Sequence, residues 1–153
     1  MSFQPNPGVA PEAQIRNDDW YPQIDLAALR AACRLDGTVT PDRLRHAAVN
    51  AVVNVNAQLA AWSVKQALAG YPSLEDVPGP LIDDEPAPVH LYRRAVYAAV
   101  QCELIERYRD YDTTAKGDKR AEAMDPRIDD ARRDLRWAIA DLQGLRRTTV
   151  ELI

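Results

Sequence analysis

The stretch TPDRLRHAAVNAVVNVNAQLAAWSVKQALAG, residues 40–70, decides the fold because it encodes one long helix with an apolar stripe. Apolar residues recur in it at steps of three or four, which keeps one face toward a core: Leu44, Ala48, Ala51, Val55, Leu59 and Trp62. Thr40 is suited to cap this helix, Pro41 to occupy its first position and Gly70 to end it. A helix of this length spans about 40 Å, which favours contact with other chains.

The sequence before this segment predicts a short helix over residues 26–35. Asp25 is a suitable N-cap, and Gly37 is suited to a left-handed conformation after the helix. Residues 71–89 hold five prolines and are predicted to form a loop.

Two further helices are predicted after that loop, over residues 89–111 and 115–143. The first has the stripe Leu91, Ala95, Ala98, Cys102 and Ile105. The second has the stripe Ile128, Ala131, Leu135, Ala138 and Leu142. Pro126 is expected to restart or kink the second helix, and Gly144 is expected to cap its C-terminus.

Both ends of the chain differ in composition from the helical middle. Prolines at positions 5, 7, 11 and 22 predict an extended arm over residues 1–22, with Trp20 and Tyr21 as its apolar anchor. Residues 147–153 are rich in β-branched side chains and predict either a short strand that pairs with another chain or a frayed end. The expected fold is therefore all-α: a bundle of about four helices over residues 23–146, with an extended N-terminal arm and a short C-terminal strand or tail.

Composition and charge narrow the classes of function. The chain has 153 residues, enough for one core, and a net charge of −4, which argues against broad binding of nucleic acid phosphates. Residues 1–86 carry 6 basic and 11 acidic side chains, whereas residues 114–153 carry 9 basic and 8 acidic. This asymmetry permits head-to-tail contact between copies, and solvated charges on helix faces are the alternative interpretation. No signal peptide or membrane span is expected, and Cys33 and Cys102 are expected to be reduced core residues of a cytosolic protein.

The residues that commonly perform catalysis lack the spacing that catalysis needs. His46 and His90 have no partner at metal-ligand spacing, and none of the three serines lies in a G-x-S-x-G elbow. The segment Lys116-Gly117-Asp118-Lys119 has one glycine where a phosphate-binding loop needs several, so it is interpreted as a turn or helix entry. We therefore expect no catalytic residue, no metal, no cofactor and no enzymatic activity.

Several segments resemble the head completion or head stabilisation proteins of temperate myophages, the GpL type. These segments keep the order and spacing of that family over about residues 20–153, and they include Arg34-Leu35-Asp36-Gly37-Thr38-Val39, Tyr92-Arg93-Arg94-Ala95-Val96, Glu106-Arg107-Tyr108-Arg109, Ala115-Lys116-Gly117-Asp118-Lys119 and Arg136-Trp137-Ala138-Ile139-Ala140-Asp141-Leu142-Gln143-Gly144.

The resemblance implies a connector-like structural protein of the virion neck. Such a protein would bind the portal vertex after DNA packaging, stabilise the filled head and form the docking ring for the tail. Its expected partners are the portal protein, neighbouring copies in a ring of about twelve, and a tail terminator or neck protein. Packaged DNA would pass through the lumen without specific binding, and assembly would take place in the host cytoplasm.

The residues expected to contact these partners lie in the arm, in the lysine-containing segment and in the tail. They are Trp20, Tyr21, Lys116, Asp118, Lys119, Thr148, Val150, Leu152 and Ile153. The sequence leaves open a stand-alone helical adaptor or small dimeric regulator that uses the helix over residues 41–69 as its seam. It also leaves open a DNA-binding module.

Overall fold

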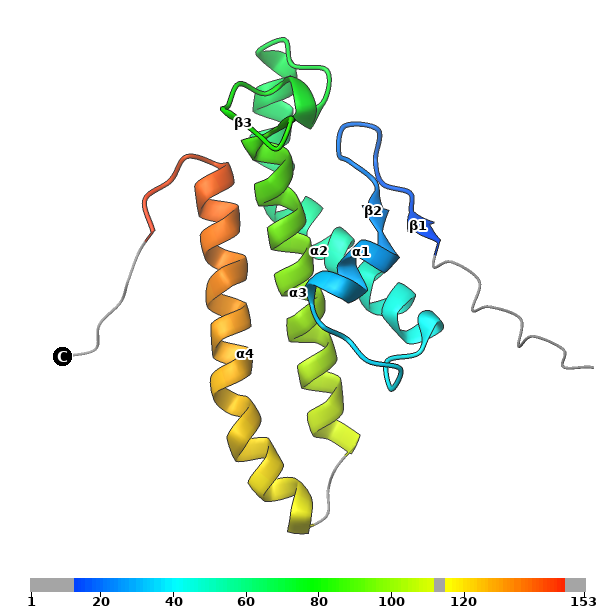
Figure 1. Cartoon of the computed structure of the whole chain (residues 1–153). Helices are drawn as coiled ribbons and strands as arrows, with labels where there is room; N and C mark the ends of the chain where they lie inside the picture. The colour runs from blue at the N-terminus through cyan, green and yellow to red at the C-terminus, as the bar shows by residue number, and fades with distance from the viewer. Residues whose placement is uncertain (1–12, 112–114, 148–153) are drawn as a thin grey trace, which may run out of the picture.

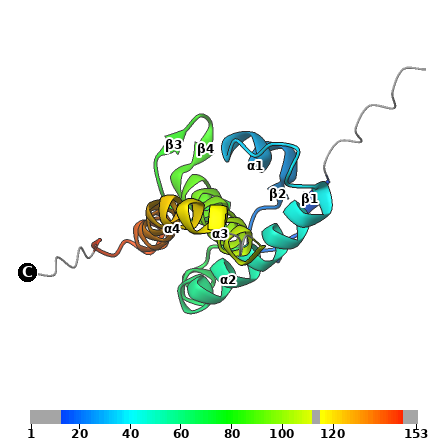
Figure 2. The ribbon, with the colours of Figure 1, turned by 90° about the horizontal axis from the view of Figure 1, so that it is seen from below.

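The computed structural model describes residues 13–111 and 115–147, and four α-helices dominate this part of the chain (Figure 1). They are α1 (Leu26–Ala32), α2 (Pro41–Leu68), α3 (Ala87–Tyr111) and α4 (Ala115–Leu142). The helix α3 packs against α2 on one side and α4 on the other (Figure 2). The predicted mainly helical architecture is confirmed.

The helix α2 forms as the sequence predicts. The Thr40 hydroxyl accepts a hydrogen bond from the Arg43 N–H, and Pro41 occupies the first helical position. Five members of the predicted stripe are buried, and the sixth, Trp62, packs against the core. Gly70 ends the helix with φ +102°, and the Tyr71 N–H returns to the Gln66 carbonyl at 3.2 Å.

The central helix α3 is buried more widely than one stripe predicts. It begins at Ala87, two residues earlier than expected, and ends at Tyr111 as expected. Because it contacts helices on two sides, it also buries residues outside the predicted stripe: Val89, Tyr92, Val96, Val100 and Leu104. A periodicity argument finds one face of a helix and misses the second face of a central one.

A restart or a kink is predicted at Pro126; the helix α4 runs through this residue without interruption, so the restart is wrong. A proline removes its own N–H from the helical ladder, and the turns on either side keep theirs. The part of α4 after Pro126 is stabilised by burial of Ile128, Ala131 and Ala138. Gly144 adopts φ +69°, and the Leu145 N–H donates to the Ala140 carbonyl at 2.8 Å, which confirms Gly144 as the C-terminal cap.

The short helix α1 ends at a different residue from the one predicted. Asp25 caps its N-terminus by accepting hydrogen bonds from the N–H groups of Ala27 and Ala28, as expected. At the other end the left-handed residue is Arg34, with φ 53°, and not Gly37. The Leu35 N–H donates to the Arg30 carbonyl at 3.0 Å, so the helix closes three residues before the glycine is reached.

The N-terminal segment from residue 13 lies on the core, although residues 1–22 are predicted to be an extended arm. The strand β1 (Gln14–Ile15) pairs antiparallel with β2 (Ile24–Asp25), and Ile15, Tyr21 and Ile24 are buried. Burial of these apolar side chains stabilises the N-terminal segment on the core. The proline content of the segment does not indicate this contribution.

The proline-rich segment before α3 is more ordered than the predicted loop. It contains the 3-10 turn η1 (Leu74–Asp76) and a hairpin of β3 (Leu81–Ile82) and β4 (Glu85–Pro86). The turn residues Asp83 and Asp84 have φ 50° and 60°, the backbone signs that two-residue hairpin loops require. The predicted C-terminal strand falls mostly in residues 148–153, outside the described part of the chain.

Candidate assembly surface

A closed polar network ties the N-terminal segment to two helices. The Asn17 side chain donates to the Tyr92 hydroxyl at 2.7 Å, and that hydroxyl donates to the Asn56 carbonyl oxygen at 2.6 Å. The Asn56 amide donates back to Asn17 at 2.9 Å. Burial raises the pKa of Tyr92, so its hydroxyl keeps its proton and acts as both donor and acceptor. The network fixes where the N-terminal segment crosses α2 and α3.

The predicted interface residues Trp20 and Tyr21 make contacts within their own subunit. The Tyr21 ring is buried and stacks on Tyr92 with centroids 4.9 Å apart. The half-buried Trp20 meets Trp62 edge to face at 5.8 Å, and its indole N–H donates to the Tyr71 carbonyl at 3.1 Å. Only the exposed part of Trp20 is therefore left for a neighbour.

The other predicted interface residues belong to the start of α4 and to the C-terminal tail. Lys116, Asp118 and Lys119 fall in the first turns of α4, whose backbone alone is described there. Thr148, Val150, Leu152 and Ile153 lie outside the described residues. Of the predicted set, the structure therefore places the side chains of Trp20 and Tyr21 alone.

The last described residue, Arg147, folds back onto α4. Its guanidinium lies 4.9 Å from the centre of the Trp137 ring and donates to Asp141 at 2.5 and 3.0 Å. The hydrogen bond from Arg147 holds the pKa of the Asp141 carboxyl below its usual range. These contacts set the point from which the C-terminal tail departs.

Sequence reasoning missed a row of exposed apolar side chains on the outer face of α2. Val49, Val53, Val64 and Leu68 are 40, 64, 59 and 84% exposed. Their spacing places them along one face of the helix, opposite the buried stripe. The signal for this face is present in the sequence, because Lys65 is the one charged residue between positions 47 and 68.

The hairpin tip carries a second exposed apolar pair, Leu81 and Ile82, which are 70 and 55% exposed. Two contacts hold the hairpin on α3: Arg93 forms a bidentate hydrogen bond with Glu85, and the His90 ring lies 2.7 Å from the Ile82 carbonyl oxygen. The tip is therefore a positioned feature rather than a loose loop.

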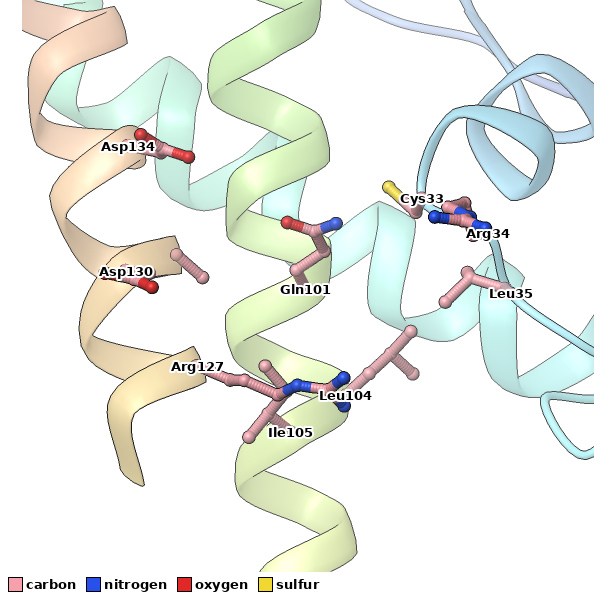
Figure 3. Close-up of a pocket in the computed structure, with 10 residues that line it drawn as sticks. Cys33, Arg34, Leu35, Gln101, Leu104, Ile105, Arg127, Asp130 and Asp134 are labelled. Carbon is pink, nitrogen blue, oxygen red and sulfur yellow. The ribbon is translucent and has the colours of Figure 1, made fainter. Parts of the chain in front are cut away.

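A cavity of about 580 Å³ lies between the end of α1 and the helices α3 and α4 (Figure 3). Cys33 and Arg34 enter it from the α1 side, Gln101 from α3, and Arg127 and Asp134 from α4. Burial raises the pKa of the Cys33 thiol to about 11, so the nucleophilic thiolate is scarce near neutral pH.

The described residues lack two features. They contain no cluster of three or more acidic, histidine or cysteine side chains that could hold a metal ion. In the same part of the chain, none of the helices combines the length and apolar character that a bilayer crossing demands.

Comparisons with known proteins assign the chain to a family. The model of the phage head completion protein (GPL) family matches residues 15–153. The head completion/stabilization protein of Escherichia phage P2 is 42% identical over 142 residues, which cover 93% of this chain and 84% of that protein. No solved structure matches the chain. The chain therefore belongs to the phage head completion protein family, whose members are structural proteins of the virion.

Proposed function

We propose that this protein binds the portal vertex after DNA packaging, stabilises the filled head and forms the ring on which the tail docks. The observation that carries the proposal is membership of the head completion family across nearly the whole chain. In this role the protein works by binding, and the copies around one vertex form a closed ring with a head-to-tail contact between neighbours.

The shape of the described chain supports this proposal. The strand β1 and the segment that follows α4 lie on opposite sides of the helical core (Figures 1 and 2). Segments that leave on opposite sides can reach two different neighbours, such as an adjacent copy and the portal protein. The net charge of −4 also suits a lumen through which DNA passes without binding.

Electron microscopy of particles made without this protein tests the proposal. We expect DNA-filled heads that lose their DNA and carry no tails, and recovery of intact tailed particles when the protein is supplied from a plasmid. Tailed, DNA-retaining particles in the absence of the protein would refute the proposed role.

A further inference from the structure

We propose that the hairpin tip of one copy, Leu81 to Asp84, docks on the C-terminal end of α2 of the next copy, at Val64, Lys65 and Leu68. The inference rests on the proposed ring and names the contact that closes it. It identifies two surfaces on one chain that fit each other, as a head-to-tail contact requires.

The two surfaces are both apolar and exposed. Leu68 and Leu81 are 84 and 70% exposed, and Val64 and Ile82 are more than half exposed. Large apolar side chains gathered in this way mark interaction sites when a soluble protein carries them together. Burying both pairs in one contact removes them from water at the same time.

Their charges are complementary. Asp83 and Asp84 stand at the hairpin turn, and residues 66–92 contain five acidic residues and no lysine or arginine. Lys65 is exposed and follows Val64 directly in the sequence of α2, three residues before Leu68. Among residues 13–107 and 127–147, whose side chains the structure describes, no salt bridge engages Lys65, Asp83 or Asp84. A contact between the surfaces would pair these charges at the rim of an apolar centre.

The positions of the surfaces suit rotation about an axis along the bundle. Both lie at the same end of the molecule, since the hairpin sits on the first turns of α3 and α2 ends beside them (Figure 1). The backbones of the hairpin and of the C-terminal end of α2 lie on opposite sides of α3 (Figure 2). Rotation about an axis conserves height along that axis, so the hairpin of one copy meets the upper end of α2 in the next.

The turn at the tip holds its two carboxylates in a defined place. Asp83 and Asp84 both hold positive φ, a conformation that glycine or asparagine adopts at lower cost. A two-residue hairpin turn fixes the direction of the side chains that it carries. Here it presents two carboxylates beside two apolar side chains.

Cysteine cross-linking of assembled particles tests the contact. We expect the double variant Ile82→Cys, Leu68→Cys to form a ladder of covalent multimers on mild oxidation, because each copy joins the next. Each single variant should form no such ladder, and wild-type protein with its two native cysteines gives the background. Covalent dimers from Leu68→Cys alone would show an α2-to-α2 seam instead and would overturn the proposal.

Matched serine variants on α2 separate the same two arrangements. Leu68→Ser should lower the yield of completed heads at least about tenfold, a change that corresponds to about 1.4 kcal/mol in association. Val53→Ser, at 64% exposure on the same face but about 16 Å from Val64 along the helix, should have no effect. An equal loss in both variants would contradict docking at one end of α2. Circular dichroism checks that both variants remain helical.

A charge exchange adds a rescue test. Lys65→Glu and the pair Asp83→Lys, Asp84→Lys should each impair assembly, and their combination should restore it. Arg45→Glu, which reverses an exposed charge near the other end of α2, is the control and should behave as wild type. Failure of the combination to restore assembly would overturn the proposed pairing of these charges.

The experiments distinguish a failure of this contact from a failure of the proposed function. If wild-type protein completes heads but the double cysteine variant gives no ladder in the particles, the docking contact is wrong and the function stands. If removal of the protein leaves heads intact, the function is wrong. The ladder is then sought with purified protein at high concentration, where its absence overturns the contact as well.

Discussion

Tyr21 and Tyr92 stack with their ring centroids 4.9 Å apart and their planes at 17°. This pair joins the N-terminal segment to the central helix, and the Tyr92 hydroxyl extends the junction to Asn17 and Asn56. Residues 13–22 are thus part of the folded core, and the part of the chain left to act as an arm is shorter than the sequence predicts.

Replacement of Tyr92 by phenylalanine should lower the free energy of unfolding by about 1–3 kcal/mol, because Asn17 and Asn56 lose a buried partner. Urea denaturation measures the change. Tyr97→Phe, on the same helix, is the control and should stay within about 0.5 kcal/mol of wild type. Equal effects in the two variants would mean that the network contributes nothing particular to stability.

The sequence predicts the helices well because their signals are local. Thr40 and Asp25 cap helices, and Gly70 and Gly144 end them, as the pattern of residues indicates. The stripes of α2 and α4 follow from a period that the chain itself displays.

The features that the sequence did not reveal depend on contacts between distant residues. The Asn17–Tyr92–Asn56 network joins three segments, and no local pattern indicates it. The hairpin at residues 81–86 forms around Asp83-Asp84, a pair that ordinary turn preferences do not favour. The exposed apolar row on α2 is indicated in the sequence by the near absence of charged residues between positions 47 and 68. Helical periodicity identifies the buried stripe and not this row.

Replacement of Arg34 by glycine should stabilise the protein by about 1 kcal/mol, because Arg34 holds the left-handed conformation after α1 and glycine adopts it without steric cost. Thermal unfolding measures the gain. Arg34→Ala removes the same side chain but keeps Cβ, and it should give no such gain. A stabilised alanine variant would show that the arginine side chain, and not the backbone, is the unfavourable element.

The ion pair of Glu85 with Arg93 should make stability depend on pH. Hydrogen bonding from Arg93 lowers the pKa of Glu85, so the pair contributes fully at neutral pH, above the unfolded pKa of about 4.3. Its contribution is lost as the pH falls through the lowered folded pKa. Glu85→Gln should therefore be less stable than wild type at pH 7, by less than about 1 kcal/mol for such an exposed pair.

Denaturation curves at several pH values check this prediction. The stability difference between Glu85→Gln and wild type should shrink as the pH falls below about 4. A difference that stays constant from pH 7 to pH 3 would show that the substitution acts through packing rather than charge.

Deletion of residues 148–153 should separate folding from assembly. The described helices end at Leu142, and Arg147 already closes onto α4, so the truncated protein should keep its helical circular dichroism. We expect it to fail in completing heads, because the tail is proposed to contact the portal or an adjacent copy. Loss of helical signal in the truncated protein would contradict this division of roles.

Protection of packaged DNA tests the central claim most directly. Purified full-length protein is added to filled heads made without it, and the DNA that survives nuclease treatment is measured. The account predicts that protection rises with added protein and saturates once each vertex is occupied. DNA that is digested equally with and without the protein would contradict a role in closing the filled head.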